Sequence, residues 1–170
     1  DEDPVVVGRL VRHELSHAAL GARGQGAPLW LNEGLAEYVS VQSMPASRRR
    51  LPQSALDVGA TARDLPGEAE FGGPDAEGWY AVSWWACEYV ASAYGADTLL
   101  LLLDRMEDGA DQDGVLREVL GITSRQLTQR AVAAGLDLHE STVSRVTAGK
   151  YLASDQGCHE FRFFFNSAIQ

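Results

Sequence analysis

Apolar residues recur at helical spacing along most of the chain. In residues 4–22, Val6, Leu10 and Leu15 recur at the spacing of a helix, and Gly21 marks its end. The same spacing, interrupted by Gly and Pro, predicts further helices at residues 29–42, 79–94, 96–108, 114–120, 123–134, 140–149 and 158–168. Because no segment alternates convincingly between polar and apolar residues, we predict a mainly α fold.

Composition places the chain among folded proteins. Its 170 residues are 45% apolar and 22% charged, which permits a core and excludes wholesale disorder. The longest apolar run, residues 98–103, is far shorter than the roughly 18–20 residues that cross a membrane. No signal-peptide pattern is present, so we expect a cytoplasmic protein, and the acidic opening at residues 1–3 suggests an internal start. Residues 43–78 contain four prolines and predict an irregular stretch with room for one short helix.

Charge divides the chain near residue 125. The net charge of −10 separates into −11 for residues 1–124 (9 Arg against 20 Asp and Glu) and +1 for residues 125–170 (5 Lys and Arg against 4 Asp and Glu). The acidic first part argues against nucleic-acid binding there, because such binding depends on Lys and Arg at phosphates. Cys87 and Cys158 lie far apart, so they indicate neither a disulfide framework nor a cysteine zinc site.

Residues 13–17 form an HExxH motif inside the first predicted helix. His13 and His17 are four residues apart, so both imidazoles lie on one helical face and can reach one ion. Glu14 follows the first ligand, where its carboxylate can hold a water molecule on the metal. The alternative is an amphipathic helix with two solvent-facing histidines.

A second helix with an N-E-G motif begins after a loop. Residues 5–42 thereby resemble the gluzincin metallopeptidases, whose third metal ligand is the Glu of this motif, here Glu33. The resemblance implies a Zn²⁺ ion held by His13, His17 and Glu33, with one open position for water. It also implies that Glu37, one turn farther on, orients a zinc-bound imidazole. The alternative is that both glutamates are ordinary surface carboxylates.

An aromatic helix opens near Tyr80 and closes at Gly95. Aminopeptidase-type gluzincins have a Tyr and a Gly at this offset, and the resemblance implies that the Tyr80 hydroxyl stabilises the oxyanion while Glu14 acts as general base. The alternative is packing beside Trp79. The implied activity is zinc-dependent hydrolysis of a peptide or protein substrate. The twelve residues before His13 lack a G-x-M-E-N motif, so exopeptidase activity is unsupported and we expect a partial catalytic domain.

Residues 127–170 outline two helices with a turn before His139, as in a helix-turn-helix. They are similar to the core-polymerase-binding region of sigma-54 transcription factors, most closely from His139 to Tyr151. The similarity implies contacts with promoter DNA or RNA polymerase from Ser141, Thr142, Ser144, Arg145 and Lys150. The sequence lacks the family's activator-interacting region and its promoter-reading box, so it is not a complete sigma factor. The alternative is a small helical bundle that touches no DNA.

These observations predict two domains. Residues 1–124 are expected to form a gluzincin-like helical active-site subdomain, and residues 125–170 a small helix-turn-helix module. The join indicates a fusion or chimera, or an artefact of gene assembly. The leading hypothesis is a zinc metallopeptidase. The second hypothesis is a transcription-related module that binds DNA or RNA polymerase and has a non-catalytic or zinc-binding N-terminal part. A third hypothesis is a pseudo-enzyme that holds zinc without turnover.

Overall fold

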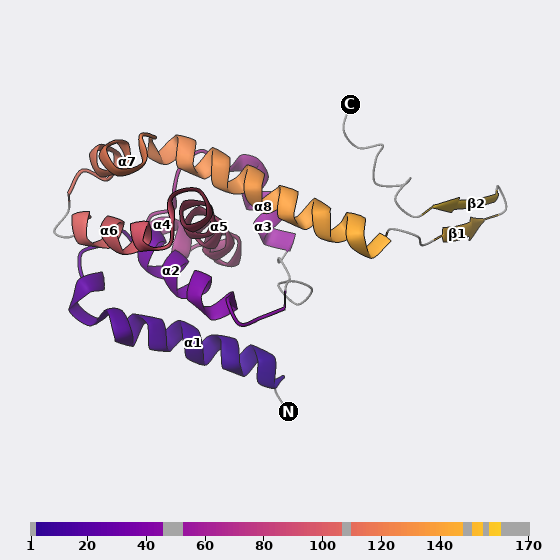
Figure 1. Ribbon diagram of the computed structural model, residues 1–170, viewed down its shortest axis with the longest axis horizontal. Coiled ribbons are helices and arrows are strands. Elements are labelled where there is room, and N and C mark those ends of the chain that lie inside the picture. Colours follow the sequence, from indigo (N-terminus) through magenta and orange to yellow (C-terminus); the bar gives the residue numbers. More distant parts are fainter. Residues whose placement is uncertain (1–2, 46–52, 107–109, 148–150, 155–156, 161–170) are drawn as a thin grey trace. The chain divides into compact units, whose positions relative to one another are not determined.

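Helices make up most of the chain, as the apolar spacing predicts. The structure is a computed structural model that describes residues 3–45, 53–106, 110–147, 151–154 and 157–160. The chain divides into two compact units, residues 1–135 and residues 136–170. In order, the elements are α1 (Pro4–Leu20), the 3-10 helix η1 (Gly21–Gly24), α2 (Leu29–Val41), α3 (Gln53–Thr61), α4 (Glu68–Phe71), α5 (Ala76–Tyr94), α6 (Asp97–Arg105), α7 (Gln112–Leu120), α8 (Ser124–Thr147), β1 (Tyr151–Ser154) and β2 (Gly157–Glu160) (Figure 1).

Helix α5 forms the centre of the first unit and packs against α2, α3, α4 and α6 (Figure 1). Its Val82, Trp85 and Val90 are almost completely buried. The contact with α2 is close at Gly34, where a Cβ atom would lie 2.4 Å from the carbonyl oxygen of Ser83. Only a residue without a side chain permits this approach. The contact therefore fixes α2, and with it the N-E-G motif, against the core.

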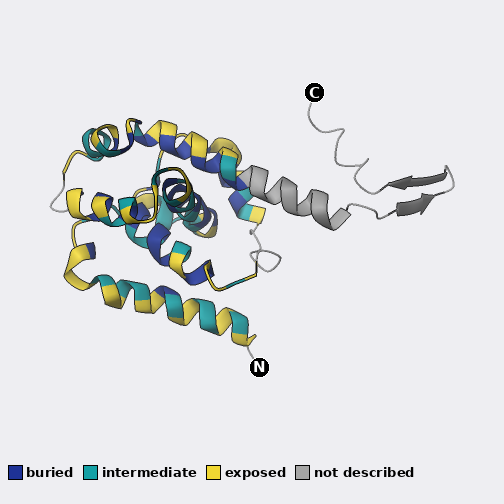
Figure 2. Cartoon of the chain, viewed as in Figure 1, coloured by how far each residue is buried: buried dark blue, intermediate teal, exposed yellow. Residues whose placement is uncertain are grey.

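Helix α1 lies at the edge of this unit and packs against α2 (Figure 1). The Asp3 side chain caps it by accepting a hydrogen bond of 2.9 Å from the Val5 amide, and Pro4 occupies its first turn. Its contact with α2 is polar, for Arg12 Nε donates to the Ser40 carbonyl oxygen at 3.1 Å. Figure 2 shows the difference in burial, because α1 is mainly exposed or intermediate whereas α2 and α5 carry buried residues.

Two sequence-based expectations are wrong in this part of the chain. The stretch 43–78 contains two helices among its described residues, α3 and α4. The expected helix-turn-helix is absent, because α8 continues from Ser124 to Thr147 through the predicted turn. Gly135 directly follows the helix expected at residues 123–134, but it is buried inside α8, where a Cβ atom would lie 2.4 Å from the Trp85 ring. Its lack of a side chain serves helix packing and not a turn.

The second unit contains an antiparallel hairpin, which the sequence did not predict. Strand β1 pairs with β2 in the register Tyr151 opposite Glu160 and Ser154 opposite Gly157. The helix expected at residues 158–168 is therefore wrong for residues 158–160, and residues 161–170 lie outside the described part. Neither four-residue strand alternates strictly between polar and apolar residues, so the sequence pattern gave no sign of them. The mainly α fold class is nevertheless confirmed. No helix in the described ranges is long and apolar enough to span a membrane.

Candidate metal centre

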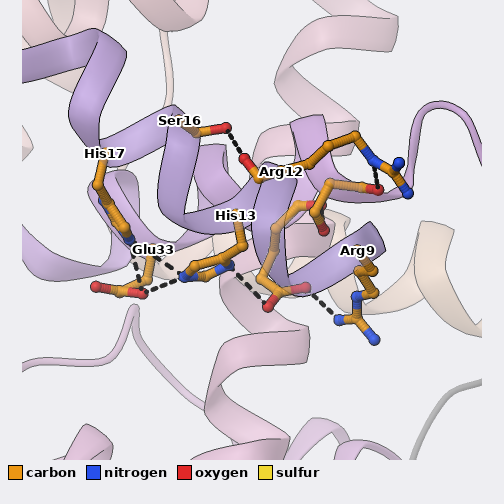
Figure 3. A network of polar contacts seen from close by, with 8 residues as sticks. Arg9, Arg12, His13, Ser16, His17 and Glu33 are labelled. Atoms are coloured by element: carbon orange, nitrogen blue, oxygen red, sulfur yellow. Dashed lines mark hydrogen bonds and ion pairs between the residues drawn. The ribbon is translucent and has the colours of Figure 1, made fainter. Parts of the chain in front are cut away.

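The structure brings the three predicted metal ligands together where α1 crosses α2. His13 and His17 lie one turn apart on α1, and Glu33 lies in the second turn of α2. His13 Nε2 is 3.2 Å from His17 Nε2 and 3.3 Å from Glu33 Oε2, and His17 Nε2 is 3.5 Å from the same oxygen. Figure 3 shows these three side chains converging. Two nitrogens and one oxygen thus form a nearly equilateral triangle.

The size of this triangle fits a zinc ion. Ligands about 2.0–2.2 Å from a tetrahedral ion lie roughly 3.3–3.6 Å from one another. The three measured separations fall in or next to that range. Imidazole nitrogen and carboxylate oxygen are also donors that zinc accepts. His13, His17 and Glu33 therefore match a divalent ion in both chemistry and spacing.

Glu37 holds His13 from the other side of its ring. Glu37 Oε1 lies 3.1 Å from His13 Nδ1, and the second oxygen of the carboxylate pairs with Arg9. In the neutral ring, this contact favours the tautomer with its proton on Nδ1, which leaves the Nε2 lone pair on the side of His17 and Glu33. The sequence-based position of Glu37 beside a ligand histidine is thus found in the structure. Its role in holding a metal-bound ring remains a prediction.

Electrostatics around His13 follow from its two carboxylate neighbours. Hydrogen bonding to Glu33 and Glu37 raises the pKa of His13 to about 9, although burial acts in the opposite direction. Burial favours a higher pKa for Glu37, but hydrogen bonds from His13 and Arg9 outweigh it and leave the pKa below its usual value. In the metal-free protein His13 is therefore an imidazolium at neutral pH, and a metal ion must displace its proton.

The other residues of the N-E-G motif position Glu33. Asn32 Nδ2 donates a 2.7 Å hydrogen bond to the carbonyl oxygen of Gly24, which ties α2 to the loop after α1. Gly34 makes the close contact with α5 described above. The motif therefore places its carboxylate through one loop contact and one helix contact. These two contacts give a structural reason for Asn32 before Glu33 and for Gly34 after it.

A cavity of about 850 Å³ adjoins the metal centre between α1 and α5. Glu14 and Tyr80, the two predicted catalytic residues, both line it. The Tyr80 ring packs edge-on against Phe71, with 4.9 Å between ring centroids. Burial raises the pKa of Tyr80, and the carboxylates of Glu33, Glu37 and Glu14 add to this effect. Glu14 is exposed and is not one of the three converging ligands.

Some site residues were not found from the sequence. Arg9 lies four residues before His13, so both side chains lie on one face of the helix. This spacing could have placed Arg9 near Glu37, with which it pairs. Glu77 and Trp84 line the cavity from α5, which is distant in sequence. No short-range pattern connects them with α1.

The predicted DNA-contacting residues lie in the second unit. Ser141, Thr142, Ser144 and Arg145 belong to the α8 backbone, and Lys150 lies outside the described residues. Their roles in DNA binding remain predictions.

Comparison with known proteins gives a result for the C-terminal region. Residues 110–170 match the family model "Sigma-54, DNA binding domain". The RNA polymerase sigma-54 factor of Caulobacter vibrioides is 50% identical over 60 residues, 35% of this chain and 12% of that protein. Sigma-54 factor 2 of Bradyrhizobium diazoefficiens is 43% identical over 65 residues, 38% of this chain and 11% of that protein. No solved structure matches the chain.

These matches correct the leading expectation. The prediction that the chain is a zinc metallopeptidase is wrong, because the matching family and relatives are transcription factors. The findings also give no support to a gluzincin domain or a peptide substrate, and the catalytic roles of Glu14 and Tyr80 depended on that prediction. The sigma-54 similarity is confirmed, but it begins at residue 110 and is to the DNA-binding domain, whereas we expected the core-polymerase-binding region.

Proposed function

We propose that the chain is a transcription-related module whose C-terminal region contacts DNA or RNA polymerase. The observation that carries this proposal is the family match over residues 110–170. The matched segment spans only about an eighth of the first relatives, so the proposal concerns DNA or polymerase contact and not the complete activity of a sigma factor. With this role we expect a cytoplasmic location and an N-terminal unit that is non-catalytic or binds zinc.

The proposed contacts lie in the second half of α8 and just beyond it. Arg145 and Lys150 can neutralise phosphates, while Ser141, Thr142 and Ser144 can donate to phosphates or base edges. Residues 125–170 carry a net charge of only +1. We therefore expect weak binding that depends on salt, strengthened when polymerase binds the same DNA.

Binding to a duplex that carries a sigma-54 promoter tests this proposal. Fluorescence anisotropy at low salt should detect binding by the full chain. The double variant Arg145→Gln/Lys150→Gln should bind about tenfold more weakly, with a salt slope smaller by about 2, because two phosphate contacts are lost. Arg105→Gln is the matched control, since Arg105 pairs with Glu118 on the first unit. Failure to bind either the duplex or core RNA polymerase at low salt would refute the proposal.

A second candidate function is zinc binding by the first unit. The triangle of His13, His17 and Glu33 supports it, because these donor atoms have the spacing of a tetrahedral site. Glu37 and Arg9 support it further by holding the ring of His13. Such an ion would tie α1 to α2, so its expected effect is on stability.

Elemental analysis of the purified chain tests the zinc proposal. We expect one zinc ion per chain, and a weaker affinity by at least about a hundredfold in His17→Gln, since a first ligand matters more than its supporting residues. Substitution by Co²⁺ should give the absorption of a tetrahedral site. Glu14→Gln is the control, because it alters a neighbouring carboxylate outside the triangle. Equal zinc content in His17→Gln and the unaltered chain would exclude the site.

A further inference from the structure

Helix α1 is amphipathic, but its polar face packs on the protein and its apolar face lies in solvent. Its polar residues Arg9, Arg12 and His13 face α2, where they make ion pairs and hydrogen bonds. Its apolar residues lie on the outside, with Val6 and Leu10 exposed to 61% and 60%. An apolar row left in solvent is a common feature of binding surfaces. This row is therefore a candidate binding surface.

The exposed row continues into the cavity beside the metal centre. Val6 and Leu10 line that cavity from α1, and Ala81 and Trp84 line it from α5. Its volume of about 850 Å³ lies within the roughly 300–1,000 Å³ of sites that enclose a ligand. The cavity and the row thus form one surface with an apolar rim and an interior large enough for a side chain.

The described wall of this cavity is rich in carboxylates. It contains Glu14, Glu37 and Glu77, and its described cationic groups, the Arg9 guanidinium and the His13 ring, both contact Glu37. Glu77 accepts a 3.2 Å hydrogen bond from Ser54 Oγ, a neutral group. Among the described residues, Glu14 and Glu77 therefore have no cationic partner, and they line the same cavity as the aromatic ring of Trp84. Carboxylates and an aromatic face together favour an organic cation.

We propose that this surface binds a polypeptide segment that inserts a lysine or arginine side chain into the cavity. The cationic end pairs with Glu14 and Glu77, and the aliphatic stem packs on Trp84. Apolar residues beside the cation cover Val6 and Leu10. A polypeptide suits the surface better than a free amine, because it fills both the cavity and the exposed row. The proposal does not depend on DNA binding or on zinc binding.

Calorimetric titration of the full chain tests this proposal. The probe is the blocked pentapeptide Ala-Leu-Lys-Leu-Ala, compared with the same peptide carrying norleucine in place of lysine, and all samples contain a chelator so that the metal content is equal. We expect the norleucine peptide to bind at least about tenfold more weakly, since it lacks the charge-assisted hydrogen bonds. Glu14→Gln and Glu77→Gln should each weaken the lysine peptide about fivefold. Glu118→Gln, which alters a carboxylate on α7, should leave binding unchanged.

Two further measurements test whether the cation must belong to a polypeptide and whether the exposed apolar row of α1 contributes to binding. n-Butylammonium carries the same cation without a polypeptide and should bind at least about tenfold more weakly than the lysine peptide. Leu10→Ser should weaken the peptide but not n-butylammonium. Equal binding of the two peptides, unchanged binding in the Glu14→Gln/Glu77→Gln double variant, or equal affinity for n-butylammonium would each overturn the proposal. Failure of the lysine peptide to bind, with helicity retained, would do the same.

Discussion

The two ends of the chain provide opposite kinds of information. In the first unit, α1 and α2 place His13, His17 and Glu33 within 3.5 Å of one another, yet the family match does not cover these residues. In residues 110–170 the match names a DNA-binding domain, although the side chains beyond residue 135 are not described. The first region has a defined site geometry but no function indicated by the family match. The second region has a proposed function, but the side chains that would make its contacts are not described. The first region therefore needs experiments that test what its site binds, and the second needs experiments that test which residues make contact.

The largest expected effect is a loss of stability of the metal-free first unit at high pH. The pKa of His13 is raised to about 9 in the folded chain, against about 6.5 when unfolded. A raised folded pKa gives stability that is complete below about pH 6.5 and is lost as the pH rises through 9. The charges that face His13 are Glu33 and Glu37 on α2 and Arg9 on α1, and His17 lies beside it. Urea unfolding with chelator should show a decrease of about 2–3 kcal/mol between pH 6 and pH 10.

A matched substitution separates this effect from other titrations. His13→Gln removes the group that titrates, so its stability should change much less over the same pH range. If the unaltered chain and His13→Gln have parallel pH profiles, the ion pairs around His13 do not have the stabilising role assigned to them. The geometry around His13 would then give no information on the stability of the first unit.

The next largest effect concerns the helix that connects the two units. Gly135→Ala places a Cβ atom against Trp85 and should lower the free energy of unfolding by about 2 kcal/mol, although Ala is the better helix former. Gly8→Ala is the control, because a Cβ atom there meets only the end of the Arg12 side chain at 3.5 Å. It should be neutral or stabilising by up to about 1 kcal/mol. Chemical unfolding measures both; stabilisation by Gly135→Ala would contradict the packing of α8 on α5.

The smallest expected effect is on zinc affinity, through a residue that contacts a predicted ligand and not the ion itself. Glu37→Gln leaves His13, His17 and Glu33 in place but weakens the hold on the ring of His13. Supporting residues of this kind typically change metal affinity by about 10–100-fold, and we expect the lower end because Gln still offers an oxygen to Nδ1. Competition with a chromogenic chelator measures this change. An unaltered zinc affinity would exclude a role for Glu37 in positioning the histidine.

The fold was predictable where local signals act alone. Gly95 ends α5 with a φ of +94°, a conformation that favours glycine, and the predicted helix ends there. The helix expected at residues 123–134 in fact continues, and Gly135, which follows it, packs on Trp85, fifty residues away in sequence. No local pattern predicts that contact. The hairpin was missed because neither of its strands alternates strictly between polar and apolar residues.

The candidate site was predictable to a similar extent. The helical spacing of His13 and His17 and, for Glu33, the resemblance to gluzincins predicted that these three side chains lie together, and the structure shows that they do. Their role as metal ligands remains a prediction. The cavity is lined by both α1 and α5, and no local pattern in the sequence relates Leu10 to Trp84. The spacing of Leu10 predicted the helix, but not that its apolar side faces outward.

One titration compares the two regions most directly. A labelled promoter duplex and a scrambled duplex are titrated with the full chain, with His17→Gln and with Arg145→Gln/Lys150→Gln. We expect the full chain to bind the promoter duplex at low salt, His17→Gln to bind it equally well, and the double variant to bind it about tenfold more weakly. The scrambled duplex measures how much of this binding is independent of sequence. Equal binding of the promoter duplex by the full chain and the double variant would contradict the proposed role of the C-terminal region.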